Sequence, residues 1–276
     1  MARPHPLLRT VAAVLPTVLA SILLADAGLL LVRVLVPAQV LRTTNDIAGN
    51  YLQTLGTIFA VLLAFVVFVV WTQFNEARTF VEREANELHD LARTATGLPA
   101  PLGDGVRRGV LRYVEIVLGP EWEAMGRRDP SGFGDGWAAL EELWDVLRRA
   151  EPASPREEAL YGELLARFND LSDARAIRLS SACTKIPAVL RVLLYSGSFV
   201  TVASMSLFAV DRFALHAVMT GALAGCVSHV LHVISDLDDC FSGDWQVGRL
   251  SFERVRAYAS SEGRGGGARE GLTARA

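Results

Sequence analysis

The sequence predicts an all-α membrane protein in which four transmembrane helices bracket a helical cytoplasmic domain, inserted between the second and the third. Three observations support this. Residues 51–71 form an uncharged apolar run that changes abruptly into a charged helical pattern, three further runs are long and apolar enough to span a bilayer, and the residues between the second and third runs are polar. The composition agrees, because 51% of the 276 residues are hydrophobic and the mean hydropathy of +0.30 is high for a soluble domain.

The first predicted helix covers residues 10–36, which are apolar apart from Asp26 and Arg33. A cleaved signal peptide is the alternative, because Ala25-Asp26-Ala27 has the small-x-small pattern of a cleavage site. The apolar run continues to Val36, however, and is longer than the roughly 7–15 apolar residues usual in a signal. We therefore expect a transmembrane helix, with Asp26 facing the interior of the helix bundle because a carboxylate is costly in lipid.

The second predicted helix, residues 51–71, runs for twenty-one residues without a charge. At about 1.5 Å per residue it spans roughly the 30 Å hydrocarbon thickness of a bilayer. Beyond it, apolar residues keep helical spacing among charged ones, at Phe80, Ala85, Leu88 and Leu91. The helix is therefore expected to continue past the membrane as an amphipathic stalk.

This second helix has two unlike faces. One carries small residues, whose spacing lets two helix backbones approach closely: Gly49, Gly56, Ala60 and Ala64. We expect that face to pack against another helix. The opposite face carries a bulky apolar stripe: Ile58, Leu62, Phe65 and Val69. The stripe either contacts lipid or, in an oligomer, forms a hydrophobic constriction of a pore that gates by dewetting.

Residues 74–186 are predicted to fold as a helical cytoplasmic domain. Amphipathic helices are expected near residues 106–117 and 137–150, separated by a looser patch at 121–136. Ser154 as N-cap, Pro155 and Glu157 then start a helix that runs towards Leu179. Residues 74–185 hold fifteen basic and twenty acidic side chains, a net charge of −5, which argues against nucleic-acid binding.

The third and fourth predicted helices, residues 186–210 and 213–234, form a second hairpin. Serine and threonine hydroxyls on the third are expected to hydrogen-bond along or between helices. The fourth carries Gly221 and Gly225 at the spacing of a close helix contact. His229, His232 and Asp236 follow on the same ridge. They could bind a divalent metal or relay protons, or they could simply lie in the headgroup region.

An acidic turn follows the fourth helix, with four carboxylates in nine residues: Asp236, Asp238, Asp239 and Asp244. Hard oxygen ligands at close spacing suit Ca²⁺, and a solvated acidic loop is the alternative. The glycine- and serine-rich tail has almost nothing to bury and is predicted to be disordered. The predicted divisions of the chain are therefore 1–73, 74–186, 187–235, 236–259 and 260–276.

Arginine placement predicts the orientation, because cytoplasmic flanks carry the excess of positive residues. One side holds the basic residues near both termini and around the central domain, whereas the other holds only Arg33, Arg42 and Arg212. Both termini and the central domain are therefore expected in the cytoplasm.

Enzymatic signatures are missing from the sequence. Cys183, Cys226 and Cys240 form no CxxC pair, so neither a disulfide framework nor a zinc site is supported. The familiar phosphate-binding and hydrolase motifs do not occur either. We therefore expect a protein that is not an enzyme.

Motifs scattered over residues 40–250 resemble a known family. They are Asn45-Asp46-Ile47-Ala48-Gly49, Gly56, the core 59–71, Glu76-Ala77-Arg78, Glu84-Ala85, Leu98-Pro99, Tyr113, Glu121-Trp122, Met125 and the acidic run 236–243. This set resembles a bacterial membrane family described as bestrophin-like. Cys240 departs from the proline that the family tends to have there, and Arg191 departs from a tryptophan.

The resemblance carries expectations about function. Bestrophins proper are pentameric anion channels, and their calcium-binding acidic turn has a similar position. The resemblance therefore implies a homo-oligomeric ion channel in the bacterial plasma membrane, with Ca²⁺ as a candidate ligand of the acidic turn. A membrane-anchored sensor or scaffold, whose cytoplasmic helices bind a protein partner, is the alternative from a different class.

Overall fold

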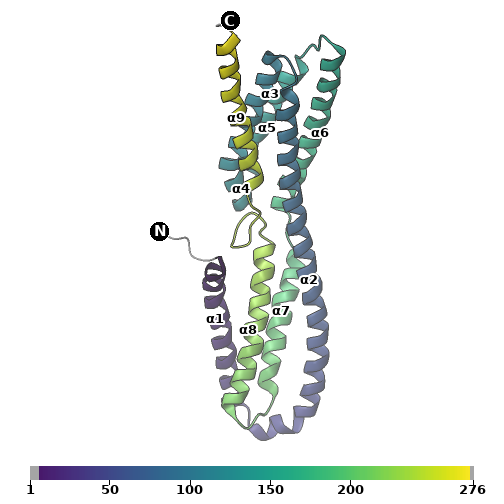
Figure 1. Cartoon of the computed structure of the whole chain (residues 1–276). Coiled ribbons are helices and arrows are strands. Elements are labelled where there is room, and N and C mark those ends of the chain that lie inside the picture. Colours follow the sequence, from purple (N-terminus) through teal and green to yellow (C-terminus); the bar gives the residue numbers. More distant parts are fainter. Residues whose placement is uncertain (1–5, 274–276) are drawn as a thin grey trace. The chain divides into compact units, whose positions relative to one another are not determined.

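The computed structural model describes residues 6–273, and within that range every regular element is helical (Figure 1). The chain forms two compact units. The first, here called the membrane unit, comprises Met1–Thr72 and Lys185–Asp238, and the second, the bundle unit, comprises Gln73–Thr184 and Asp239–Ala276. These limits differ by one to three residues from the predicted ones at 73, 186 and 235.

Among the described residues, four helices are long and apolar enough to cross a bilayer, as predicted. They are α1 (Pro6–Leu35), α2 (Ala38–Ala95), α7 (Ala188–Ser204, followed by the 3₁₀ turn Met205–Leu207) and α8 (Phe213–Leu237). Helix α2 runs for 58 residues without a break. The predicted stalk is therefore the direct continuation of the second transmembrane helix.

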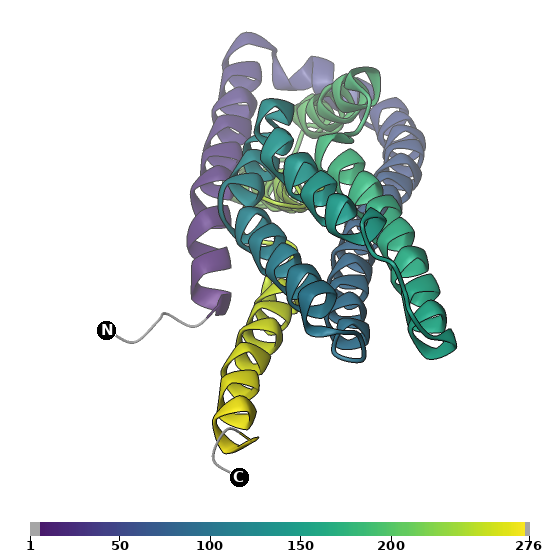
Figure 2. The same ribbon diagram turned by 90° about the horizontal axis from the view of Figure 1, so that it is seen from above.

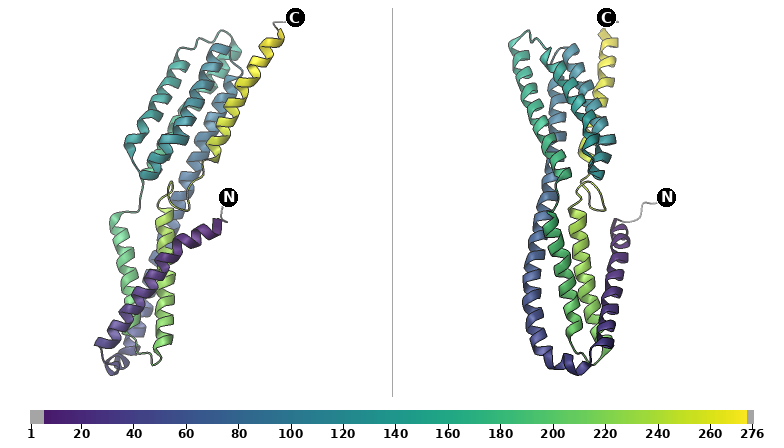
Figure 3. Two further views of the ribbon diagram at one scale, coloured as in Figure 1. Left: turned by 90° about the vertical axis from the view of Figure 1, so that its left-hand side faces the viewer. Right: turned by 180° about the vertical axis from the view of Figure 1, so that it is seen from behind.

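Two glycines on α8 let α1 lie close along it (Figure 3). A Cβ atom at Gly221 would lie 3.0 Å from Ile22 Cγ2, and one at Gly225 would lie 3.2 Å from Ile22 Cδ1. The α1–α8 contact therefore uses the predicted small residues of the fourth helix.

Helix α2 packs on α7 through a different face from the one predicted. A Cβ atom at Gly197 of α7 would lie only 2.7 Å from Phe59 Cδ2, and Phe59, Val66 and Val70 of α2 are buried. In this contact α7 supplies the small residue, Gly197, and α2 supplies the bulky side chain, Phe59.

The predicted packing face of α2 is left open within one chain. A Cβ atom at Gly56 would have nothing within 4 Å, and one at Gly49 would meet only the Phe208 ring at 3.9 Å. Ala60 and Ala64 are exposed. Within this chain no helix covers Gly56, Ala60 and Ala64 in the described residues, because Gly197 accepts Phe59 on another side of α2. Contact of this face with a second copy stays a prediction.

The bundle unit consists of the second half of α2 with α3 (Ala100–Ile116), α4 (Trp122–Arg127), α5 (Gly134–Arg148), α6 (Pro155–Cys183) and α9 (Leu250–Thr273). Figure 2 shows α9 (yellow) and α6 (green) on different sides of α3 and α5 (teal). A π-helical turn, Val117–Glu121, joins α3 to α4, and the 3₁₀ turn Pro130–Phe133 precedes α5. The patch predicted to be loose is therefore largely helical.

Helix α6 begins as its sequence predicts. Ser154 Oγ accepts a hydrogen bond from the Glu157 N–H at 3.3 Å, and the Glu157 carboxylate accepts one from the Ala153 N–H at 2.9 Å. The first bond satisfies a backbone donor that the first turn of the helix leaves open, and the second ties the residue before the N-cap to that turn.

The predicted disordered tail is helical up to Thr273, as part of α9, and residues 274–276 lie outside the described range. Phe252, Val255 and Ala259 anchor the start of α9 in the core of the bundle unit. The helix extends beyond these buried residues to Thr273.

Candidate functional site

The bulky stripe of α2 is the first candidate site. Ile58 is 65% exposed and Phe65 60% exposed, while Leu62 and Val69 are half-buried. One chain therefore leaves the stripe largely uncovered in the middle of its longest apolar segment. The stripe remains available to lipid, to a pore axis or to another subunit.

The ionisable residues of the membrane unit do not form one cluster. Asp26 lies against α8 at Gly221, and its Oδ1 atom is buried without a hydrogen-bond partner in the described part of the chain. Arg33 is not its partner, because it donates to the carbonyl oxygens of Val210 and Asp211 at 3.3 and 3.2 Å. His229 is exposed and His232 is half-buried.

The acidic turn holds carboxylates with separate partners. Asp238 is buried and accepts a hydrogen bond from the Ile186 N–H at 2.9 Å. It also lies 3.6 Å from Lys185 Nζ and 3.4 Å from an Arg191 nitrogen. Asp239 forms an ion pair with Arg128.

The acidic turn is therefore not arranged like a set of ligands around a metal ion. Within residues 6–273, no group of three or more His, Cys, Asp and Glu side chains is placed to hold a metal ion. This applies to Asp236, Asp238, Asp239 and Asp244, and equally to His229, His232 and Asp236. Calcium binding stays a prediction drawn from the sequence, and Asp238 acts in the structure as a link between the start of α7 and the end of α8.

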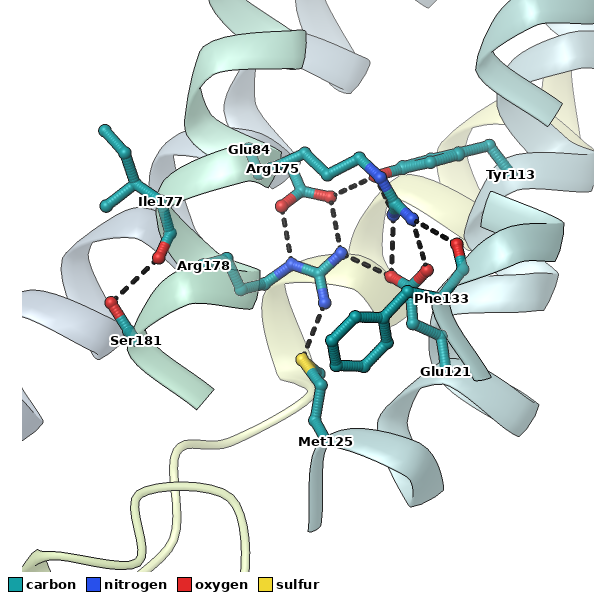
Figure 4. Close-up of polar contacts among 9 residues, drawn as sticks. All are labelled: Glu84, Tyr113, Glu121, Met125, Phe133, Arg175, Ile177, Arg178 and Ser181. Atoms are coloured by element: carbon teal, nitrogen blue, oxygen red, sulfur yellow. Dashed lines mark hydrogen bonds and ion pairs between the residues drawn. The ribbon is translucent and has the colours of Figure 1, made fainter. Parts of the chain in front are cut away.

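A buried polar layer crosses the bundle unit (Figure 4). Its members come from α2, α3, the π-helical turn and α6, and their side chains are fully buried: Glu84, Tyr113, Glu121, Arg175 and Arg178. Two carboxylates face two guanidinium groups, so the layer is electrically balanced. Charges buried this deeply require such pairing, because their hydration has been lost.

Arg178 joins both carboxylates of the layer. Its Nε and Nη2 atoms lie 2.6 and 3.0 Å from the two oxygens of Glu84, and Nη2 also lies 2.6 Å from Glu121 Oε1. Its Nη1 atom donates to Met125 Sδ at 2.9 Å. The guanidinium therefore uses all three nitrogens.

Arg175 completes the layer on the other side of Glu121. Its two Nη atoms donate to the two Glu121 oxygens at 2.7 and 2.6 Å, and further bonds reach Tyr113 Oη at 2.9 Å and the Phe133 carbonyl at 3.0 Å. Tyr113 in turn donates to Glu84. The network thus links helices that are far apart in sequence.

This layer, with Arg175 and Arg178 at its centre, was not predicted from the sequence. A signal was available. On α6 six of the eight buried positions follow a 4,3,4,3,4 spacing in which the two arginines take places otherwise held by apolar residues: Leu164, Phe168, Leu171, Arg175, Arg178 and Ala182. Charged residues at core positions of a helical repeat indicate a buried polar pairing.

Comparison with known families gives a match to the bestrophin-like domain over residues 19–252. The chain belongs to the bestrophin-like family. The bestrophin-like match includes all four candidate membrane helices except the first residues of α1, together with the polar layer. Comparison with curated proteins gives no significant match.

Solved structures share this bestrophin-like fold. A variant of a bacterial bestrophin homologue from Klebsiella pneumoniae superposes with a TM-score of 0.69 at 13% identity, over 88% of this chain and 98% of that one. A second structure of that homologue has a TM-score of 0.68 at 14% identity, over 87% and 96%. A structure described as a membrane protein has a TM-score of 0.67 at 15% identity, over 88% and 97%. The bestrophin family is a family of channels rather than of enzymes.

The polar layer makes the stability of this bestrophin-like protein sensitive to acid. Burial by itself raises the pKa of Glu121, but Arg178 and Arg175 outweigh burial and hold the pKa below its ordinary value of 4.5. A lowered folded-state pKa contributes stability that is present above the unfolded pKa and lost as the pH falls through the folded one. We expect the melting temperature of the purified protein to decrease as the pH falls below about 4.5.

Variants at neighbouring glutamates separate this effect from general acid denaturation. Glu121→Gln should lower the melting temperature at pH 7 and should weaken its further decrease in acid. Glu123→Gln is the control, because Glu123 is exposed and pairs with the equally exposed Arg127 at 3.6 Å. Identical acid profiles for the two variants would contradict the assignment to Glu121.

Proposed function

We propose that the protein is a homo-oligomeric ion channel in the bacterial plasma membrane, with α2 of each copy lining the conduction path. Membership of the bestrophin-like family and the bestrophin fold support a channel-like membrane protein. The observation that carries the assignment to α2 is that one chain leaves two of its faces uncovered, the small-residue face and the bulky stripe.

The two uncovered faces suit different surroundings. In a closed ring of identical subunits, each lining helix has one side towards the axis and other sides towards its neighbours. Gly56, Ala60 and Ala64 allow another helix to approach closely, which favours a place in a subunit contact. The stripe of Ile58, Leu62, Phe65 and Val69 is then directed to the axis, where apolar side chains form a constriction that gates by dewetting.

Ion flux through reconstituted liposomes tests this proposal. Phe65→Ala widens and hydrates an apolar constriction, so basal flux should rise several-fold over wild type. Phe68→Ala is the control, because Phe68 is equally exposed, at 66%, but lies about 90° round the helix from the centre of the stripe at 100° per residue. It should change flux little.

Flux should be measured across chloride, sodium and potassium gradients, with and without Ca²⁺. An equal change in ion flux for Phe65→Ala and Phe68→Ala would contradict the placement of the stripe in the conduction path. If the ion flux of neither the wild type nor Phe65→Ala exceeds that of empty liposomes, the channel assignment is wrong. The alternative function, a membrane-anchored scaffold, is then favoured.

Cysteine labelling tests the proposed orientation, with both termini and the central domain in the cytoplasm. In a variant lacking the native cysteines, Ser131→Cys and Ser261→Cys should be protected from a membrane-impermeant thiol reagent in intact cells, whereas Thr43→Cys should be labelled. All three positions are exposed in the structure, so burial does not explain protection. Labelling of Ser131→Cys from outside would reverse the orientation.

A further inference from the structure

A groove of about 640 Å³ lies within the membrane unit, between α1, α7 and α8. Its wall is mostly apolar, with Leu24, Phe199 and Val202 among its lining residues. The hydroxyl groups of Ser21 and Ser228 in its wall bond to each other at 2.9 Å. Its volume is within the range of about 300–1,000 Å³ that is typical of pockets for small ligands.

The groove is long enough for an acyl chain to lie along it. Its α7 side extends from Tyr195 to Ser206, its α8 side from Ala224 to Ser235 and its α1 side from Thr17 to Val32. Eleven to fifteen residues of helix correspond to roughly 16 to 22 Å, which is about half to three-quarters of the 30 Å hydrocarbon thickness of a bilayer.

Polar groups gather at one end of the groove, where α7 begins and α8 ends. Tyr195, His232 and Ser235 line that end, and their side chains make no hydrogen bond or ion pair within the described part of the chain. A smaller cavity of about 110 Å³ adjoins it, shares Tyr195 and Ser235, and adds Lys185 and Arg191.

Two basic side chains lie at this end of the groove. Lys185 and Arg191 both lie beside the single carboxylate of Asp238, at 3.6 and 3.4 Å. No other acidic residue is among the described residues that line the two cavities. Two basic side chains therefore lie at this end, next to hydroxyl donors and an apolar groove.

We propose that the membrane unit binds one anionic phospholipid, with its phosphate near Lys185 and Arg191 and one acyl chain in the groove. The proposal goes beyond the channel function and does not rest on it. Basic residues recognise phosphate and the groove recognises the chain, so an amphiphile that carries both is bound better than either part alone.

Native mass spectrometry of delipidated full-length protein, titrated with dioleoyl lipids, tests the proposal. Phosphatidylglycerol should bind once per chain and at least about tenfold more tightly than zwitterionic phosphatidylcholine, as expected for salt-sensitive recognition of an anionic headgroup. Arg191→Gln should remove most of this preference. Arg212→Gln is the control, because Arg212 is exposed at the start of α8, away from both cavities.

A second variant tests the acyl chain. Gly28 lines the groove, and a Cβ atom there would have nothing within 4 Å, so Gly28→Leu fills the groove without disturbing helix packing. It should abolish binding of both lipids while the melting temperature of the lipid-free protein is kept. Glycerol phosphate, which has no acyl chain, should not displace phosphatidylglycerol.

Three results would overturn the proposal. Equal binding of the two lipids to the wild type would contradict the headgroup site. Unchanged lipid binding to Gly28→Leu would contradict the placement of the acyl chain in the groove. Absence of bound lipid, together with dissociation of oligomers by Gly28→Leu, would show that a second copy occupies the groove. A protein that conducts no ions could still bind the lipid, so failure of one proposal is distinguishable from failure of the other.

Discussion

Arg178→Met is expected to destabilise the protein by about 3–5 kcal/mol, because it removes one partner from a buried set of ion pairs. Arg178 neutralises Glu84 and shares Glu121 with Arg175. Without it, one carboxylate remains buried without a countercharge. A melting temperature lower than that of the wild type by about 6–20 °C should result for a unit of this size.

An exposed ion pair between the same two helices provides the control. Arg83 of α2 lies 3.9 Å from Asp170 of α6, and their side chains are 50% and 46% exposed. Arg83→Met should therefore cost less than about 1 kcal/mol. Similar melting temperatures for Arg178→Met and Arg83→Met would contradict the energetic importance of the buried layer.

Gly197→Leu is expected to separate α2 from α7 and to lower the yield and melting temperature of the folded protein. A Cβ atom at this position would lie 2.7 and 2.8 Å from two atoms of the buried Phe59 ring. Overpacking of this kind typically costs about 1–3 kcal/mol, and more where neighbours cannot move. Adding Phe59→Ala should recover part of the loss, because it returns space to the same contact.

Gly56→Leu is the matched substitution on α2. A side chain there meets nothing within 4 Å in the same chain, so the stability of the single chain should be unchanged. If the small-residue face packs against a second copy, the oligomer should dissociate, as light scattering can measure. Equal loss of single-chain stability in Gly56→Leu and Gly197→Leu would contradict the described packing of α2.

Much of the fold was predictable from the sequence. Residues 51–71 and the three other apolar runs identify membrane helices because hydrophobic length is a local property of the chain. The α6 N-terminus was equally predictable, since Ser154 and Glu157 bond only to their own turn. The Gly221 and Gly225 spacing also indicated a close helix contact, although not that α1 would supply it.

The helix contacts and charge partners at the candidate sites could not be predicted from the sequence, because they depend on tertiary structure. Periodicity identifies residues that share a face of a helix, but it does not identify which element meets that face. Gly197, and not Gly56, receives the bulky partner of the α2–α7 contact. Likewise, Asp238 lies beside Lys185 and Arg191, which are more than forty residues away in sequence, so its role in joining α7 and α8 could not be read from the acidic composition of the turn.

The amino-acid sequence by itself thus determined the number of membrane helices, the long α2 and the class of protein, because each follows from hydrophobicity and helical propensity along a continuous segment. Tertiary structure alone decided the partners of charged and small residues. Glu84 and Arg178 are 94 residues apart, and their charges are tolerated in the core only because the fold brings them within hydrogen-bonding distance. That distance depends on how whole helices pack, which no local pattern specifies.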